Sequence, residues 1–137
     1  MEPAHTPLPL LVTAYLRHHR TRDRADFWAF DEVKDRVLWN PDPAAAWELV
    51  LALVRAADDD SLGYVGAGPL EDLVTAHGVS LIQEIEHEAM IDPRFQACLA
   101  RVWLSEGELP PDILERVVRA SGGAIEPLPP LSGEDEA

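Results

Sequence analysis

The sequence predicts an all-α domain, and three observations indicate this fold class. Apolar residues recur with helical spacing along the chain, and no stretch shows the strict alternation of a half-buried strand. Prolines begin several of the apolar segments, as in Asp42-Pro43 and Asp92-Pro93, which is typical of helix starts. The 137 residues and the 47% hydrophobic content suit one globular domain. We therefore expect a compact array of about six to seven helices packed as antiparallel hairpins, in a solenoid-like stack.

Three helices are expected in the N-terminal part of the chain. The first covers about residues 8–20, and an amphipathic second helix covers about residues 25–39. The third covers residues 43–56 with Asp42 as its N-cap, and it is apolar almost all round. Such a helix must be enclosed by neighbours, so it is the predicted central helix.

Four further helices are expected toward the C-terminus. The first of them, over about residues 69–77, should end at Gly78 in the left-handed conformation of a C′ glycine. A second covers about residues 80–90. The apolar stripe of the third begins after Asp92-Pro93 and extends to Trp103, and the last helix covers residues 111–118.

The run Gly-Ala-Gly-Pro-Leu-Glu-Asp at residues 66–72 has two interpretations. A phosphate-binding loop uses free backbone N–H groups at a helix start and usually a nearby cation. No lysine or arginine lies between Arg55 and Arg94, and the run ends in two carboxylates. We therefore expect a tight corner that lets two helices approach closely, with Gly68 as N-cap, Pro69 at the first helical position and Glu71 bonded back to the Gly68 N–H. The residues expected to shape this corner are Gly66, Gly68, Pro69 and Glu71.

Two segments resemble parts of catalytic or metal sites. Glu84 and His87 have the Glu-x-x-His spacing of a carboxylate-bridged metal site, but that site needs a second copy, which the sequence lacks. His87 should face solvent. Cys98, the single cysteine, lies on an apolar stripe and is expected to be a buried, inert thiol. We assign no catalytic, metal-binding or cofactor-binding residue.

Three of the remaining histidines have structural interpretations. His18 and His19 lie near the end of the first predicted helix, where they complement the helix dipole. His19 continues an apolar stripe, which predicts a packing role. His77 should bond the last carbonyl groups of its own helix.

The net charge of −14, from 11 basic and 25 acidic residues, restricts the possible partners. Such a field repels nucleic acid and anionic lipid and favours basic proteins. The single cysteine and the absence of a secretory signal pattern point to the cytoplasm. The acidic clusters lack the pattern of a calcium-binding loop. The predicted partner-binding carboxylates are Asp58, Asp59, Asp60, Glu84 and Glu88.

The domain organisation follows from a change in composition near residue 120. Residues 1–120 hold the helical segments and form the predicted domain. Residues 121–137 are rich in glycine, proline and acids, and we expect a flexible tail there.

Several motifs together resemble those of a family of small bacterial domains of unknown function. The most specific is GAGPLEDL at residues 66–73, and the resemblance covers about residues 40–105, without the N-terminal helices or the tail. It implies a compact all-α domain and no reaction, ligand or partner. The other matching motifs are Trp47…Leu53-Val54, His77-Gly78, Ile85-Glu86…Ala89, Asp92-Pro93-x-Phe95 and Leu99-x-x-Val102-Trp103.

The function that these observations favour is binding of another protein without catalysis. An immunity or accessory protein that covers a basic partner surface would have this charge. One alternative is an inhibitor that imitates the charge of nucleic acid and blocks a DNA-binding protein. Another is a small metal-dependent or thiol enzyme built on Glu84 and His87 or on Cys98.

Overall fold

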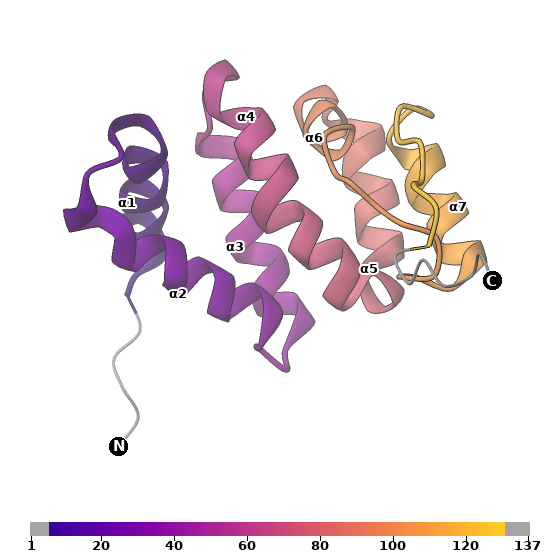
Figure 1. Ribbon diagram of the computed structural model, residues 1–137, viewed down its shortest axis with the longest axis horizontal. Helices are drawn as coiled ribbons and strands as arrows, with labels where there is room; N and C mark the ends of the chain where they lie inside the picture. The colour runs from indigo at the N-terminus through magenta and orange to yellow at the C-terminus, as the bar shows by residue number, and fades with distance from the viewer. Residues whose placement is uncertain (1–5, 131–137) are drawn as a thin grey trace.

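Helices make up most of the part of the chain that the structure describes. The computed structural model describes residues 6–130, and these contain no β-strand, only an isolated bridge between Ser105 and Leu128. The all-α fold class is confirmed, and the helices stand side by side along the long axis of the molecule (Figure 1). In chain order the elements are α1 (Leu8–Thr21), the 3₁₀ helix η1 (Arg24–Asp26), α2 (Phe27–Leu38), α3 (Pro43–Ala56), α4 (Asp59–Val65), the π-helix η2 (Gly66–Leu70), α5 (Glu71–Ile91), α6 (Pro93–Leu99) and α7 (Pro111–Ala120).

An ion pair holds the turn between α1 and α2. Arg17 donates two hydrogen bonds of 2.8 Å to the carboxylate of Asp26, one from Nε and one from Nη2. The Asp26 side chain is almost buried, and its hydrogen bonds from Arg17 hold its pKa below the usual range. Asp23 caps η1 by accepting the Ala25 N–H. The predicted second helix therefore begins with a 3₁₀ turn and becomes α-helical at Phe27.

Both predicted Asp-Pro helix starts are confirmed. The Asp42 carboxylate accepts the Ala44 N–H at 3.0 Å at the start of α3. The Asp92 carboxylate accepts the Arg94 N–H at 2.9 Å at the start of α6. Each aspartate thus satisfies an N–H group that the first helical turn leaves free, and the proline that follows has no N–H to satisfy.

The predicted central position of α3 is also confirmed. It packs against α1, α2, α4, α5 and α6, so that its apolar residues meet neighbours on several sides. Burying these side chains stabilises the fold by about 25 cal/mol for each Å² of apolar surface removed from water. The buried residues of α3 are Ala46, Leu49, Val50, Leu53 and Val54.

One helical path runs from α4 through η2 into α5. The Asp58 carboxylate accepts the Ser61 N–H at 2.9 Å, and Ser61 Oγ accepts the Asp58 N–H at 3.1 Å, so that a capping box starts α4. The glycine run lies inside this path, and the predicted corner there is wrong. The π-helix widens one turn, so Pro69 fits inside the helix although it has no N–H to donate.

The reversal of the chain occurs within α5. A straight helix over residues 59–91 would be about 48 Å long. Arg94, which follows α5, nevertheless contacts Asp59 at the start of α4 at 3.5 Å and donates to the Val54 carbonyl at 3.2 Å. The helix therefore bends back on itself, as the ribbon shows at the lower end of α5 (Figure 1).

The predicted helix end at Gly78 is wrong. Gly78 lies inside α5, is buried, and does not have the positive φ of a C′ glycine. Leu109 packs against it, and a Cβ at Gly78 would lie 3.4 Å from Leu109 Cδ2. The glycine therefore leaves room for a neighbouring side chain on a continuous, bent helix.

Gly66 allows η2 to lie directly against the end of α6. A Cβ at this position would lie 2.4 Å from the Cys98 carbonyl oxygen and 2.8 Å from Arg101 Cβ. Both distances are shorter than side chains tolerate, and the first involves a backbone atom that cannot rotate away. Only glycine fits at this contact.

The sixth helix is shorter than predicted. It ends at Leu99, and the chain then leaves the helical path, so Val102 is buried while Trp103 is 66% exposed. The predicted inward position of Trp103 is wrong because a helical stripe holds only while the helix continues. Glu71 accepts the Trp103 N–H at 3.0 Å and so fixes this turn.

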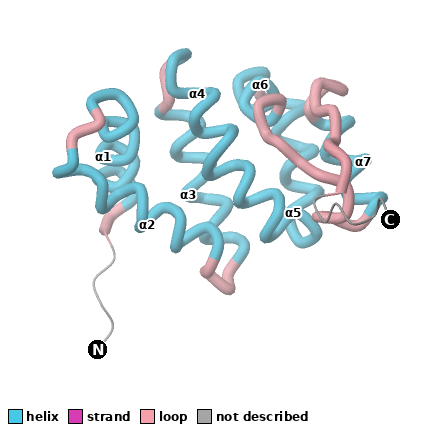
Figure 2. The backbone as a smooth tube through the Cα atoms, viewed as in Figure 1, coloured by secondary structure: helices cyan, strands magenta, loops and turns pink. Residues whose placement is uncertain are grey.

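Residues 121–130 pack against the helical domain, so the tail predicted from Ser121 does not describe them. Ile125 is buried, and its N–H donates to Ser121 Oγ at 3.2 Å. The Leu128 N–H donates to the Leu104 carbonyl, and the Leu128 carbonyl accepts the Glu106 N–H, both at 2.8 Å. Figure 2 shows these two loop segments beside each other. The remaining tail residues, 131–137, lie outside the described part.

We expect Gly66→Ala to destabilise the protein by about 1–3 kcal/mol, the usual cost of inserting a methyl group into a filled contact. The measurement is urea unfolding followed by far-UV circular dichroism. Gly68→Ala is the matched control, since a Cβ there would meet only Tyr15 Oη, at 3.4 Å. Equal stability of the two variants would contradict the close contact at Gly66.

Candidate functional site

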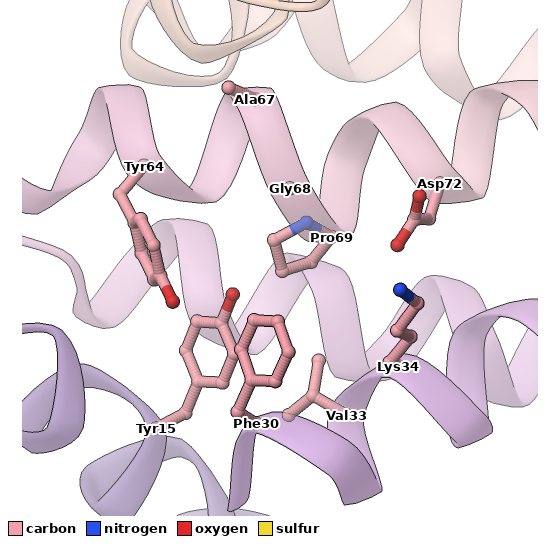
Figure 3. A pocket seen from close by; sticks show the side chains of 9 residues that line it. All are labelled: Tyr15, Phe30, Val33, Lys34, Tyr64, Ala67, Gly68, Pro69 and Asp72. Atoms are coloured by element: carbon pink, nitrogen blue, oxygen red, sulfur yellow. The ribbon is translucent and has the colours of Figure 1, made fainter. Parts of the chain in front are cut away.

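One pocket of the described structure lies where η2 faces α1 and α2. It has a volume of about 280 Å³. Tyr15 of α1, residues of α2, and Tyr64 and the glycine run on the opposite side enclose it (Figure 3). We call it the bulge pocket. Its lining residues are Tyr15, Phe30, Val33, Lys34, Tyr64, Ala67, Gly68, Pro69 and Asp72.

The π-helix forms one wall of the bulge pocket. Single wide turns of this kind are rare in proteins overall, but those that occur often lie at functional sites. The glycine run lies inside a helix, so its N–H groups are not the free groups of a helix start, which an anion-binding loop requires. The predicted capping role of Glu71 is wrong, because its carboxylate accepts the Trp103 N–H and Gly68 is not an N-cap.

Two tyrosines place hydroxyl groups at the pocket. The rings of Tyr15 and Tyr64 lie 5.4 Å apart between centroids, and Tyr15 also stacks on Phe30. Burial raises the pKa of Tyr15 far above its usual value, and the Tyr64 phenol raises it further. Tyr15 therefore stays a neutral phenol.

Lys34 and Asp72 face each other at one side of the pocket (Figure 3). They form no ion pair within 4 Å, and no described residue donates a hydrogen bond to the Asp72 carboxylate. Burial raises the pKa of Asp72, and the Lys34 charge partly offsets this. The site thus holds a partly desolvated carboxylate opposite the ammonium group of Lys34, with no ion pair within 4 Å between them.

A second hollow lies beside α7. It is a groove of about 450 Å³ with Leu109, Leu114, Val118 and prolines on its surface. Its lining residues include Glu106 and Glu115 and no cation, and Glu115 pairs with Arg119 at 3.1 Å. We call it the α7 groove. Its lining residues are Glu106, Gly107, Leu109, Pro111, Leu114, Glu115, Val118 and Pro127.

The three aspartates predicted to bind a partner begin α4. Asp58 is engaged in the capping box, and its bonds from Ser61, with a smaller effect of Arg20, lower its pKa. Asp59 lies 3.5 Å from Arg94. Of the three, Asp60 alone is exposed without a cap or an ion pair in the described residues. They do not form one unopposed acidic patch.

The two predicted partner-binding glutamates of α5 differ from each other. Glu84 is exposed, as expected. Glu88 is buried and lies 3.4 Å from Arg55, so its predicted position on a partner-binding surface is wrong. His87 faces solvent, and no group of three or more metal-ligating side chains occurs in residues 6–130.

Two of the four described histidines, His18 and His19, pack against aromatic rings. His19 stacks on Tyr64 with centroids 4.0 Å apart, and His18 meets Phe27 edge-on at 5.5 Å. His77 Nε2 lies 2.8 Å from the carbonyl oxygen of Val37, so it joins α5 to α2 and does not cap its own helix as predicted. The sequence held no signal for this long-range contact.

Cys98 is buried on the inner side of α6, as predicted. Its Sγ lies 3.4 Å from the carbonyl oxygen of Leu62. Burial raises the pKa of the thiol to about 12, although Arg94 and Arg101 act in the opposite direction. A thiol in this state is a poor nucleophile at neutral pH.

The comparisons with known proteins identify a family without a known activity. A family model described as "Family of unknown function (DUF6869)" matches residues 17–125. The match includes α2 and the end of α1, so it extends beyond the 40–105 resemblance of the sequence motifs. No curated protein and no solved structure matches the chain. Among the described residues no helix is long and apolar enough to cross a membrane.

We expect Asp72→Asn to raise Tm slightly at neutral pH. The raised pKa of Asp72 means that the folded protein binds this proton more tightly than the unfolded chain does. The charged carboxylate therefore costs stability at neutral pH, and the cost disappears as pH falls through the raised pKa. The difference from the wild type should shrink over that range, whereas Asp35→Asn, at an exposed site on α2, should not show this pattern. A loss of stability in Asp72→Asn would contradict the expectation.

The Cys98 thiol should react with Ellman's reagent only when the protein opens. A buried thiol with a pKa of about 12 is almost entirely protonated at neutral pH. Release of the coloured product should be slow for the folded protein and complete at once in denaturant. Fast reaction of the folded protein would show that Cys98 is accessible.

Proposed function

The chain belongs to the family of unknown function DUF6869, and we propose that this member binds a basic segment of another protein, without catalysis. The α7 groove carries this proposal. It combines an apolar floor with an edge of carboxylates, the pairing that an amphipathic basic segment would complement.

The apolar floor of the groove would supply affinity. Leu114 and Val118 of α7 are partly exposed on the groove and also pack on the core. A partner side chain placed here would remove apolar surface from water on both molecules. Because core residues hold this floor in place, little ordering would be needed on binding.

The carboxylates would supply attraction over a longer range. The net charge of −14 steers cationic partners toward the protein, and salt screens this effect. Asp112 follows the lining residue Pro111 in the sequence, Glu126 precedes the lining residue Pro127, and both are exposed, as are Glu106 and Glu115. The exposed carboxylates that form no ion pair and cap no helix in the described residues are Asp31, Asp35, Glu48, Asp60, Glu84, Glu106, Glu108, Asp112 and Glu126.

The distribution of these carboxylates supports protein binding over imitation of nucleic acid. They occur on α2, α3, α4, α5 and α7, from one end of the helix array to the other. An imitation of a phosphate backbone needs a regular row on one face. The proposal includes an immunity or accessory role, which the charge supports, and a cytoplasmic location, which the free cysteine supports. It also includes a bacterial source, which rests on the resemblance of the motifs. We also propose that the glycine run at residues 66–70 is a motif shared by members of the family.

The test is recovery of partners from a native lysate of the source organism at low and at high salt. We expect a basic protein to bind at low salt and to be released at high salt. The double variant Glu106→Gln/Glu115→Gln should weaken binding of the recovered protein by up to about tenfold. Asp31→Asn/Glu48→Gln removes the same charge from α2 and α3, which do not line the groove, and should have a smaller effect.

Recovery of no protein at low salt would refute the proposal. Equal weakening by the two double variants would support attraction by the overall charge and refute the α7 groove as the docking surface. Leu114→Ala separates the apolar contribution, because it should weaken binding at high salt as much as at low salt.

A further inference from the structure

The bulge pocket has features that binding of a basic protein does not use. Its walls are mostly apolar, with Tyr15, Phe30, Val33 and Pro69 facing the space (Figure 3). A cavity of about 150 Å³ can hold a benzene molecule. The volume of about 280 Å³ therefore suits a small molecule with one branched or aromatic group.

The opposite charges of the pocket do not form a close ion pair. The Lys34 ammonium and the Asp72 carboxylate point toward each other, but they are not within 4 Å (Figure 3). Asp72 is partly buried and accepts no hydrogen bond from a described side chain or N–H group. A partly desolvated charge with no direct hydrogen bond or close ion pair is unfavourable, and a ligand that carries the reversed pair of charges would satisfy both groups.

The glycine run keeps the space open. Gly68 has no side chain, and a Cβ there would lie 3.4 Å from the Tyr15 hydroxyl. A longer side chain would enter the pocket between Tyr15 and the helix. The wide turn of η2 brings Ala67, Gly68 and Pro69 to the wall of the pocket. A role in forming this wall accounts for two glycines and a proline inside a helix, where the chain makes no corner.

We propose that the bulge pocket binds a small zwitterion with an apolar group, of the class of a free aliphatic or aromatic amino acid. The carboxylate of the ligand pairs with Lys34 and its ammonium with Asp72, while the apolar group lies against Tyr15, Phe30 and Val33. The Tyr15 and Tyr64 hydroxyls are the remaining polar groups near the ligand. This site lies apart from the α7 groove and is independent of it.

The experiment uses the full chain labelled with ¹⁵N. Free leucine or free phenylalanine is added in steps, and the amide chemical shifts are measured by NMR. N-acetyl-leucine, which lacks the ammonium, and leucinamide, which lacks the carboxylate, are the matched ligands. We expect saturable shifts around Tyr15, Lys34 and residues 64–72, and binding of each matched ligand weaker by about tenfold or more.

Three variants assign the contacts. Asp72→Asn should reduce the preference for leucine over N-acetyl-leucine, and Lys34→Met should reduce the preference over leucinamide. Gly68→Leu should block binding of all ligands. Asp35→Asn is the matched control on the same helix as Lys34 and should leave binding unchanged, since Asp35 is exposed and does not line the pocket.

The proposal is overturned if neither amino acid shifts residues around the pocket, or if N-acetyl-leucine and leucinamide bind as well as leucine. Shifts confined to another surface also overturn it. Loss of binding in Gly68→Leu counts as support only if its circular dichroism spectrum and Tm match those of the wild type, and the two charge variants provide the test if it does not fold.

Discussion

The fold depends on one backbone contact, the approach of Gly66 to the Cys98 carbonyl. The bend within α5 turns the chain back, and the contact fixes where the returning segment lies along η2. Arg94 makes the second attachment of this segment, through the carbonyl groups of Val54 and Ala57. Together they join the middle of the chain to its C-terminal part. The same glycine run forms a pocket wall on its other side, so packing and the candidate site share one short sequence.

The sequence predicted well the features that depend on neighbouring residues. The Asp-Pro starts at Asp42 and Asp92, the enclosed helix α3 and the buried Cys98 follow from local periodicity and capping chemistry. The prediction of a corner at residues 66–72 was wrong, because glycine and proline usually indicate a helix boundary and a π-helix has no common sequence pattern. The prediction for Trp103 was also wrong, because α6 ends at Leu99 and the Trp103 N–H bonds to Glu71, which is far away in the sequence.

The candidate site was beyond sequence reasoning because its residues come from separate helices. Tyr15, Lys34 and Asp72 are far apart in the chain and meet only because α1, α2 and the η2 path pack together. For the acidic residues, the sequence gives their number but does not show which of them are free. Burial of Glu88 and the pairing of Asp59 with Arg94 depend on the fold. Charge counts therefore describe the electrostatic field, and the packing decides which carboxylates can meet a partner.

The pairing of Leu128 with the segment after α6 has a practical consequence for shortened versions of this protein. A version cut after α7 at residue 120 would remove Ile125 from the core and leave the Leu104 carbonyl and the Glu106 N–H without their backbone partners. Such a fragment would expose a strip of apolar surface and is expected to aggregate. Expression boundaries and fusion junctions therefore belong beyond Pro130.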